Sequence, residues 1–311
     1  MRPTHHHLPT FVNRESMSEC VATADASAEL DHEQASGLRI SGSVADRLAC
    51  KLCCDAANEI GGSTMLPRAI LFDLDDTLIQ AHGGAQAAWL LVAHELADDL
   101  APLTPSEVTE AVVAFARNFW ADPERHRLWR MRLSDARREI VAGSFAALAS
   151  TGRRVPSVGV VRRLADRFSA HRDQHMRLFP DAHNVIDGLR ACGTRLALVT
   201  NGASEAQRAK IDRFDLASRF DHIQIEGEHA FGKPDERAYR HALRQLGADA
   251  RDTWMVGDNL EWEVAAPQRL GIFGIWFDAA GKGLPPDTHI RPDRIVASLS
   301  ELLPTAAAQG A

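Results

Sequence analysis

The sequence of 311 residues lacks long stretches of either apolar or basic residues. No apolar run approaches about 18 residues, the length that a membrane-spanning helix needs. The N-terminus also lacks the apolar centre of a secretory signal, so we expect a cytoplasmic protein with no membrane partner. The formal net charge is −7 and no long basic stretch occurs, which argues against nucleic acid as a partner. With 45% hydrophobic residues, the chain can form a substantial core in one or two domains.

Cysteine is scarce, and four of the five cysteines lie in the first 54 residues. Cys50-Lys51-Leu52-Cys53 forms a C-x-x-C motif, which is found in zinc sites and redox pairs. A zinc site needs a second pair of ligands at suitable spacing, and only Cys20 and scattered histidines such as His5 to His7 are available. We therefore do not assign a metal site to this segment.

Residues 1–64 have poor hydrophobic periodicity, and Ser, Ala, Asp, Glu and Gly dominate them. Such a segment buries too little apolar surface to offset its ordering entropy, so we expect a disordered extension. Met65 precedes the first predicted strand and is an alternative start of the protein, in which case residues 1–64 are not translated. The sequence does not decide between these two readings. Residues 305–311 are expected to form a short tail.

A group of carboxylates follows the first predicted strand, the apolar run Ala69–Phe72. Open α/β sheets bind their ligands at this end of a strand. Asp73 and Asp75 repel each other there and are costly to bury, and a divalent cation removes both penalties. Asp73 is then a candidate nucleophile that accepts a phosphoryl group, and Asp75 a candidate general acid/base. The plainer alternative is a helix N-cap followed by acidic first-turn residues.

Three further motifs follow in the chain, two of them at strand ends. They are Thr200-Asn201-Gly202 after Leu196–Val199, Gly232-Lys233-Pro234, and Gly257-Asp258-Asn259 after Trp254–Val256, with Glu261 and Glu263 close behind. Together with Phe72-Asp73-Leu74-Asp75-Asp76-Thr77-Leu78, these motifs resemble, in type and order, those of the haloacid dehalogenase superfamily. The resemblance covers roughly residues 68–303.

The resemblance implies a Rossmann-like α/β core and phosphoryl transfer assisted by Mg²⁺. It makes Asp73 the residue that becomes an aspartyl-phosphate, and Asp75 the group that protonates the leaving oxygen and then activates water. The implied phosphate-binding residues are Thr200, Asn201 and Lys233. The implied Mg²⁺ ligands are the side chains of Asp73 and Asp258 and the backbone carbonyl of Asp75.

One residue departs from the pattern of the superfamily. The second acid of the last motif, five residues after Asp258, is commonly Asp in relatives, whereas here it is Glu263. We expect Glu263 to orient Asp258, Lys233 or a metal-bound water from outside the ligand set. Glu261 competes for this role, and both residues are equally compatible with simple helix-start acids favoured by the helix dipole.

Helical patterns fill residues 84–176, between the first and second strands of the predicted sheet. Thr104-Pro105-Ser106-Glu107 is a strong helix start, and Ser134 is expected to cap another helix. Ala85–Leu100 and Val158–Phe168 complete four predicted helices. They resemble the all-helical cap that one subclass of the superfamily inserts after its first motif, although a packed domain with no role in substrate choice is the alternative.

The strand–helix alternation after residue 177 predicts a doubly wound parallel sheet. The predicted organisation is thus a catalytic core of residues 65–83 and 177–304, with a cap of residues 84–176.

Two polar groups in the predicted cap have both a functional and a plain interpretation. His171 and His175 lie four residues apart, as metal ligands on a helix can, and Trp129–Arg132 with Arg137-Arg138 form a basic group that could meet an anionic substrate. Solvated helix faces are the commoner origin of both patterns, and we favour that interpretation.

The presence of Asp75 favours a phosphatase, because the dehalogenases that give the superfamily its name lack an acid at this place. The motifs look most like the branch of nucleotidases, acylneuraminate-9-phosphatases and phosphoglycolate-type phosphatases. The predicted function is hydrolysis of a small phosphorylated metabolite with Mg²⁺ as cofactor, by a monomer or homodimer. A phosphomutase and a non-catalytic binding protein are the alternatives.

Overall fold

The computed structural model describes residues 66–81 and 84–304 of the chain. The predictions made for residues 1–64, for Met65 as a start, for the cysteine and histidine motifs near the N-terminus and for the tail of residues 305–311 lie outside the described residues. Within them, no helix is long and apolar enough to cross a membrane.

A six-stranded parallel sheet forms the centre of the fold, in the order β5-β4-β1-β6-β7-β8. Its strands are β1 (Ala69–Phe72), β4 (Arg195–Thr200), β5 (His222–Ile225), β6 (Thr253–Gly257), β7 (Phe273–Phe277) and β8 (Arg294–Val296). In the register of the sheet, Ala69 of β1 is aligned with Arg195 of β4 and with Thr253 of β6. The predicted class, a doubly wound Rossmann-like sheet with a helical insert, is confirmed.

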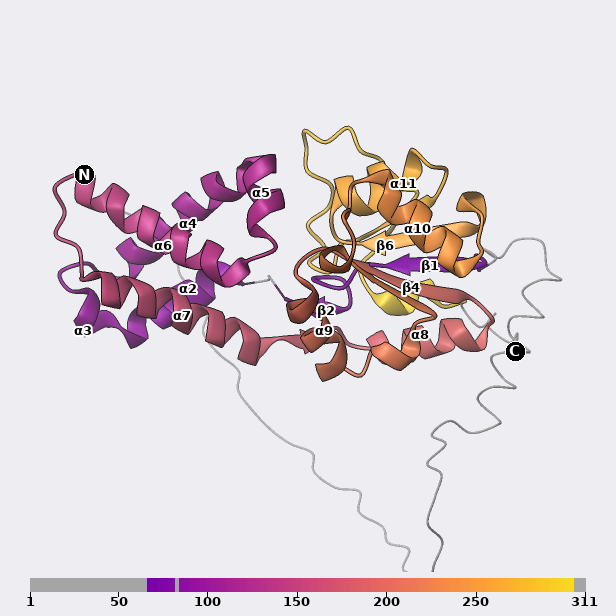
Figure 1. The fold of residues 1–311 in the computed structure, drawn as a ribbon, viewed down its shortest axis with the longest axis horizontal. Coiled ribbons are helices and arrows are strands. Elements are labelled where there is room, and N and C mark those ends of the chain that lie inside the picture. Colours follow the sequence, from indigo (N-terminus) through magenta and orange to yellow (C-terminus); the bar gives the residue numbers. More distant parts are fainter. Residues whose placement is uncertain (1–65, 82–83, 305–311) are drawn as a thin grey trace, which may run out of the picture. The chain divides into compact units, whose positions relative to one another are not determined.

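Alternating side chains of the strands are buried on the two faces of the sheet, because helices cover both. Ile70 and Phe72 of β1 pack on one face in a cluster that includes residues of α8 (Ala182–Ala191). Ala69 and Leu71 pack on the other face with residues of α10 (Glu236–Leu246). Figure 1 shows α8 and α10 on opposite sides of β1, β4 and β6. Burial on both faces explains why these strands appear in the sequence as short continuous apolar runs.

The helical insert begins and ends at a two-stranded antiparallel sheet of β2 (Ile79–Gln80) and β3 (Arg177–Leu178). Between these strands lie α2 (Ala85–Glu95), α3 (Ala97–Leu100), α4 (Pro105–Ala121), α5 (Pro123–Trp129), α6 (Leu133–Ser150) and α7 (Val158–His175). They enclose an apolar cluster of their own, separate from the two clusters of the sheet. The division into a core of residues 65–83 and 177–304 and a cap of residues 84–176 stays a prediction.

The start of α4 was predicted correctly, and the starts of two other insert helices were not. Thr104 and Glu107 form a reciprocal capping box at the N-terminus of α4. Ser134, by contrast, lies inside α6, which begins at Leu133 after the non-helical Arg132 and has no side-chain cap. The helix α5 was missed, because none of its residues is buried and no apolar period marks it. The predicted helix of residues 85–100 is divided into α2 and α3 at Leu96.

The remaining elements follow the predicted alternation closely. They are α9 (Ser204–Arg213), α11 (Ala266–Gln268), the π-helical turn η4 (Leu260–Ala265) and the 3-10 turns η1 (Ala217–Arg219), η2 (Glu226–Glu228), η3 (Ala250–Asp252) and η5 (Leu299–Leu302). The π-helical turn directly follows the motif at the end of β6 and shapes the site described next.

Candidate active site

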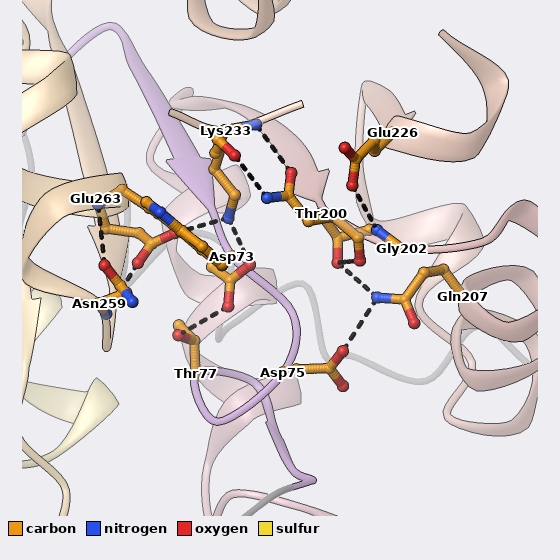
Figure 2. A network of polar contacts seen from close by, with 12 residues as sticks. Asp73, Asp75, Thr77, Thr200, Gly202, Gln207, Glu226, Lys233, Asn259 and Glu263 are labelled. Carbon is orange, nitrogen blue, oxygen red and sulfur yellow. Dashed lines mark hydrogen bonds and ion pairs between the residues drawn. The ribbon is translucent and has the colours of Figure 1, made fainter. Parts of the chain in front are cut away.

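The predicted site residues meet at the carboxyl ends of three neighbouring strands. Asp73 directly follows β1, Thr200 is the last residue of β4, and Asp258 directly follows β6. Because β1 lies between β4 and β6, its loop lies between the other two loops. Lys233 reaches the same point from the loop before α10, and Figure 2 shows it beside Asp73.

Asp73, Lys233 and Glu263 form a buried network of charges. The Lys233 ammonium nitrogen lies 2.5 Å from a carboxylate oxygen of Asp73 and 2.8 Å from one of Glu263. The Thr77 hydroxyl donates a 3.3 Å hydrogen bond to the second oxygen of Asp73. Burial by itself would lower the pKa of Lys233, but the charges of Asp73 and Glu263 outweigh burial and hold that pKa above its ordinary value. One cation therefore neutralises part of the charge of two carboxylates.

Glu263, not Glu261, is the acid that reaches the site. Its side chain is 1% exposed, and besides contacting Lys233 it accepts a 2.8 Å hydrogen bond from the Asn259 backbone N–H. Glu261 lies at the surface with a side chain 47% exposed and pairs with Arg269. The Asn259 side chain caps the first turn of η4, and the wide π-helical turn then directs Glu263 inward.

The glycine of the Gly257-Asp258 motif is required by this arrangement. A Cβ atom on Gly257 would lie 2.1 Å from the Cγ of Glu263, closer than two carbon atoms can approach. The absence of a side chain at the end of β6 thus makes room for the longer arm of Glu263. Burial raises the pKa of Glu263 to about 7, and the charge of Lys233 opposes that shift.

Asp258 and Asp73 have the chemistry that a hard divalent cation needs. Burial, with repulsion from Asp73 and Glu263, raises the pKa of Asp258 to about 8. Burial likewise raises the pKa of Asp73, against the attraction of Lys233. Among the described residues no group of three His, Cys, Asp or Glu side chains is arranged to hold a metal. Mg²⁺ is commonly held by one or two carboxylates plus waters, so two repelling carboxylates fit it.

Asp75 points toward α9 and is held there by two residues that the sequence analysis missed. The Lys210 ammonium nitrogen lies 2.7 Å from both carboxylate oxygens of Asp75. The Gln207 amide donates to Asp75 at 3.0 Å and to the Thr200 hydroxyl at 2.6 Å. Figure 2 shows Gln207 bridging Asp75 and Thr200. The signal for Gln207 and Lys210 was their spacing of three residues on the helix that follows Thr200.

Asn201 lines the cavity, and its side-chain amide bonds the loop of Lys233. Its side-chain amide donates to the Lys233 carbonyl at 2.7 Å and its oxygen accepts from the Lys233 N–H at 2.8 Å. The next N–H, of Gly202, donates to Glu226 at 3.0 Å. These bonds join the loops after β4 and β5 to the lysine loop, so Thr200 and Lys233 have fixed positions relative to each other.

Arg130 is a correction to the interpretation of the basic group as a solvated face. It follows α5 of the insert, but its side chain is 12% exposed and forms an ion pair with Glu226. Its guanidinium donates to the Lys233 carbonyl at 3.4 Å and lies over the Trp262 ring at 5.4 Å. Burial between a carboxylate and an aromatic face holds Arg130 out of the solvent. By contrast, Arg138 lies at the surface and pairs with Asp166.

The two histidines of the α7 pair contact each other. The rings of His171 and His175 stack at 4.0 Å, and the Nδ1 of His175 lies 2.8 Å from the His171 carbonyl oxygen. The site opens into a cavity of about 860 Å³ between the sheet loops and the helical insert. Residues of both contribute to its wall, so a molecule larger than phosphate fits against Asp73.

The sequence profile of the haloacid dehalogenase-like hydrolases matches residues 67–271, and the chain belongs to this family. It is 34% identical over 184 residues to a phosphoserine phosphatase of Thermus thermophilus, a match that covers 59% of this chain and 65% of that protein. It is 29% identical over 245 residues to the N-acylneuraminate-9-phosphatase of Rattus norvegicus, covering 76% of this chain and 92% of that protein. A glyceraldehyde 3-phosphate phosphatase of Pyrococcus abyssi is 27% identical over 215 residues, or 68% of this chain and 81% of that one.

Solved structures agree on the fold. A hydrolase of this superfamily from Bacillus subtilis, bound to magnesium, has a TM-score of 0.56 at 23% identity and covers 76% of this chain and 97% of its own. An L-2-haloacid dehalogenase has a TM-score of 0.54 at 18% identity and covers 77% of this chain and 98% of its own. The fold therefore occurs with two chemistries, but the curated relatives are phosphatases, and the chain is a phosphoric monoester hydrolase.

Proposed function

We propose that this protein hydrolyses a small phosphomonoester with Mg²⁺ as cofactor and through an aspartyl-phosphate on Asp73. The observation that carries the proposal is the pair of Asp73 and Lys233, at 2.5 Å, beside the loops that line the cavity. The lysine favours the ionised form of Asp73, which a nucleophile requires, and its charge reduces the repulsion between the carboxylates and an approaching phosphate. The relatives described above are phosphatases of small phosphorylated metabolites, which supports the same class of substrate.

Residues on the cavity wall, with Lys233 and Lys210 bonded to two of them, supply each step of the reaction. An oxygen of Asp73 attacks phosphorus in line, the bond to the leaving oxygen breaks, and Asp75 gives that oxygen a proton. Asp75 then takes a proton from a water that attacks the phosphoryl group, and the bond to Asp73 breaks, releasing inorganic phosphate. Thr200 and Lys233 hold the phosphoryl oxygens throughout. Lys210 and Gln207 hold the carboxylate of Asp75 within the site.

The side chains of Asp73 and Asp258 and the backbone carbonyl of Asp75 would hold Mg²⁺, because oxygen atoms of this kind are ligands that the cation accepts. The cation would offset the negative charge that accumulates on the phosphoryl oxygens. A cytoplasmic location and the choice between monomer and homodimer stay predictions from the sequence.

The test is release of inorganic phosphate from a panel of phosphorylated metabolites, with Mg²⁺ and with a chelator. We expect Asp73→Asn to retain at most about a few per cent of the rate while it keeps its melting temperature, because the amide is nearly isosteric but not nucleophilic. Asp249→Asn, at an exposed position 74% accessible, is the matched control and should keep full activity.

Three results would contradict the proposal. Full activity of Asp73→Asn would show that Asp73 is not the nucleophile. Full activity in chelator would show that the reaction needs no divalent cation. Transfer of the phosphoryl group to a second position of the substrate, without release of inorganic phosphate, would instead identify a phosphomutase.

A further inference from the structure

The part of the cavity wall that the helical insert contributes is largely apolar and aromatic, and four arginines, His126, Ser134 and Asp135 interrupt it. The insert contributes Trp89 of α2, Trp120 of α4, Ile140 of α6 and Phe168 of α7. A phosphate group alone does not fill about 860 Å³, so this wall faces the part of the substrate that remains after hydrolysis. The charges on the wall therefore select among substrates.

Three of the four arginines have a guanidinium that is bonded to another residue or exposed to solvent. Arg130 is paired with Glu226, and Arg172 donates a hydrogen bond to the Ala81 carbonyl. Arg132 is exposed and lies over the Trp129 ring at 5.1 Å. These contacts leave the fourth arginine, Arg137 of α6, as the candidate for binding a substrate.

Arg137 is half-buried and makes no hydrogen bond or ion pair with any residue that the structure describes. Its guanidinium lies 5.5 Å from the centre of the Phe168 ring, and that ring stacks on Trp89 at 3.5 Å with an angle of 2° between the planes. The three groups come from α6, α7 and α2. Stacking orients a guanidinium while its N–H groups stay available in its own plane.

The electrostatic environment of Arg137 agrees with an anion as its missing partner. Burial lowers the pKa of the guanidinium, and the charge of Arg172 adds to this shift. Asp173 and the catalytic Asp75 oppose it, and neither is hydrogen-bonded to Arg137. An anion in the plane of the guanidinium would stabilise the charge that burial penalises.

We propose that Arg137 binds a carboxylate of the substrate, so that the protein prefers phosphomonoesters that carry a carboxylate at the end remote from the phosphate. The inference rests on the proposed phosphatase function and specifies its substrate class. A carboxylate matches the single charge and the planar fork of one guanidinium, while the aromatic wall contacts the carbon chain between the two anions. Arg137 acts in binding and takes no part in proton or phosphoryl transfer.

The test measures binding without turnover, in Asp73→Asn protein with Mg²⁺. Calorimetry compares 3-phosphoglycerate with glycerol 3-phosphate, which has a hydroxymethyl group where the first has a carboxylate. We expect the carboxylate to improve affinity, and Arg137→Met to reduce this preference by about tenfold to a hundredfold, the range for a charged hydrogen bond. Arg137→Lys keeps the charge without the planar fork and should recover only part of it.

Arg138→Met is the matched control, since Arg138 is the next residue of α6 but lies at the surface, paired with Asp166. It should leave the preference unchanged, and melting temperatures verify that each variant folds. An equal loss of affinity for both ligands in Arg137→Met would show a structural role and overturn the inference. The inference would also be overturned if glycerol 1,3-bisphosphate bound more tightly than 3-phosphoglycerate and Arg137→Met abolished that difference. Arg137 would then bind a second phosphate rather than a carboxylate.

The result is separable from the proposed hydrolysis. If binding depends on Arg137 but the unmodified protein releases no phosphate from the carboxylated ester, the proposed function fails and the binding site stands. If phosphate is released from both esters and the preference does not depend on Arg137, only the inference fails.

Discussion

Glu263 shows how a long acidic side chain is accommodated in a buried site. The side chain is buried, contacts Lys233 and Asn259, and occupies the space that a side chain on Gly257 would fill. The sequence left Glu261 and Glu263 as alternatives, because both follow Asp258 within five residues and both suit the start of a helix. The π-helical geometry of η4 separates them, and no residue pattern in the sequence announces that geometry.

The first prediction at this scale concerns the Mg²⁺ dependence of the rate. Glu263→Gln removes the charge that balances Lys233, so Lys233 should pair more strongly with Asp73 and compete with the cation. We expect the Mg²⁺ concentration for half-maximal rate to rise by about tenfold to a hundredfold, as for other residues that contact metal ligands indirectly. Titration of the phosphate-release rate with Mg²⁺ measures it.

Glu261→Gln is the control, because Glu261 pairs with Arg269 at the surface and should leave the Mg²⁺ dependence unchanged. If Glu261→Gln changed the Mg²⁺ dependence and Glu263→Gln did not, Glu261 would be the acid that supports Mg²⁺ binding. No effect of either substitution would make both ordinary helix-start acids.

At the scale of elements, the helices and strands with a strong local sequence signal are those whose bounds could be predicted. The bounds of β1 and the start of α4 were predicted correctly, because an apolar run defines the strand and a capping box defines the start of the helix. The helix α5 has no such signal, and the position of Arg130 after it depends on Glu226, which is 96 residues away in the chain. Contacts of this kind between an insert and a sheet are set by tertiary packing, which local propensity does not encode.

The ion pair of Arg130 and Glu226 predicts a coupling between α5 and the loops of the sheet. Arg130→Met should lower kcat/KM by about tenfold or more, because it leaves a buried carboxylate without its cation beside Gly202 and the lysine loop. A double-mutant cycle with Glu226→Gln should recover part of the loss, since that change removes the unpaired charge. Kinetics and melting temperatures of the four proteins measure the coupling.

Arg127→Met is the control for this cycle, because Arg127 lies on α5, three residues before Arg130, and its side chain is exposed. Additive effects of the Arg130 and Glu226 substitutions would contradict the coupling.

On the scale of the whole molecule, the order of strands gathers the site from distant parts of the chain. Four motifs were recognised in the sequence, and the strand order β4-β1-β6 places their loops next to each other. What the sequence could not supply was the set of partners around them. Gln207 and Lys210 lie on α9 and Arg130 follows α5, and the partners of these residues are known only when α9 and α5 are placed against the loops.

The last prediction follows from the buried carboxylates, which make the stability of the metal-free protein depend on pH. Asp258 has a pKa of about 8 and Glu263 of about 7 in the folded state, both above their ordinary values of 3.8 and 4.5. A carboxyl group with a raised pKa binds its proton more tightly in the folded than in the unfolded state. The free energy of unfolding must then fall as the pH rises from about 5 to about 8, and level off above that range.

Mg²⁺ should reverse this trend, because it takes the place of the protons and binds only when the carboxylates are ionised. We expect the melting temperature in chelator to decrease between about pH 5 and pH 8, and the stabilisation by Mg²⁺ to increase over the same range. In Asp258→Asn the amide imitates the protonated acid, so both the decrease in chelator and the gain with Mg²⁺ should be much smaller. Parallel pH profiles with and without Mg²⁺ would show that these carboxylates do not bind the cation, and the metal would then have to be placed elsewhere in the protein.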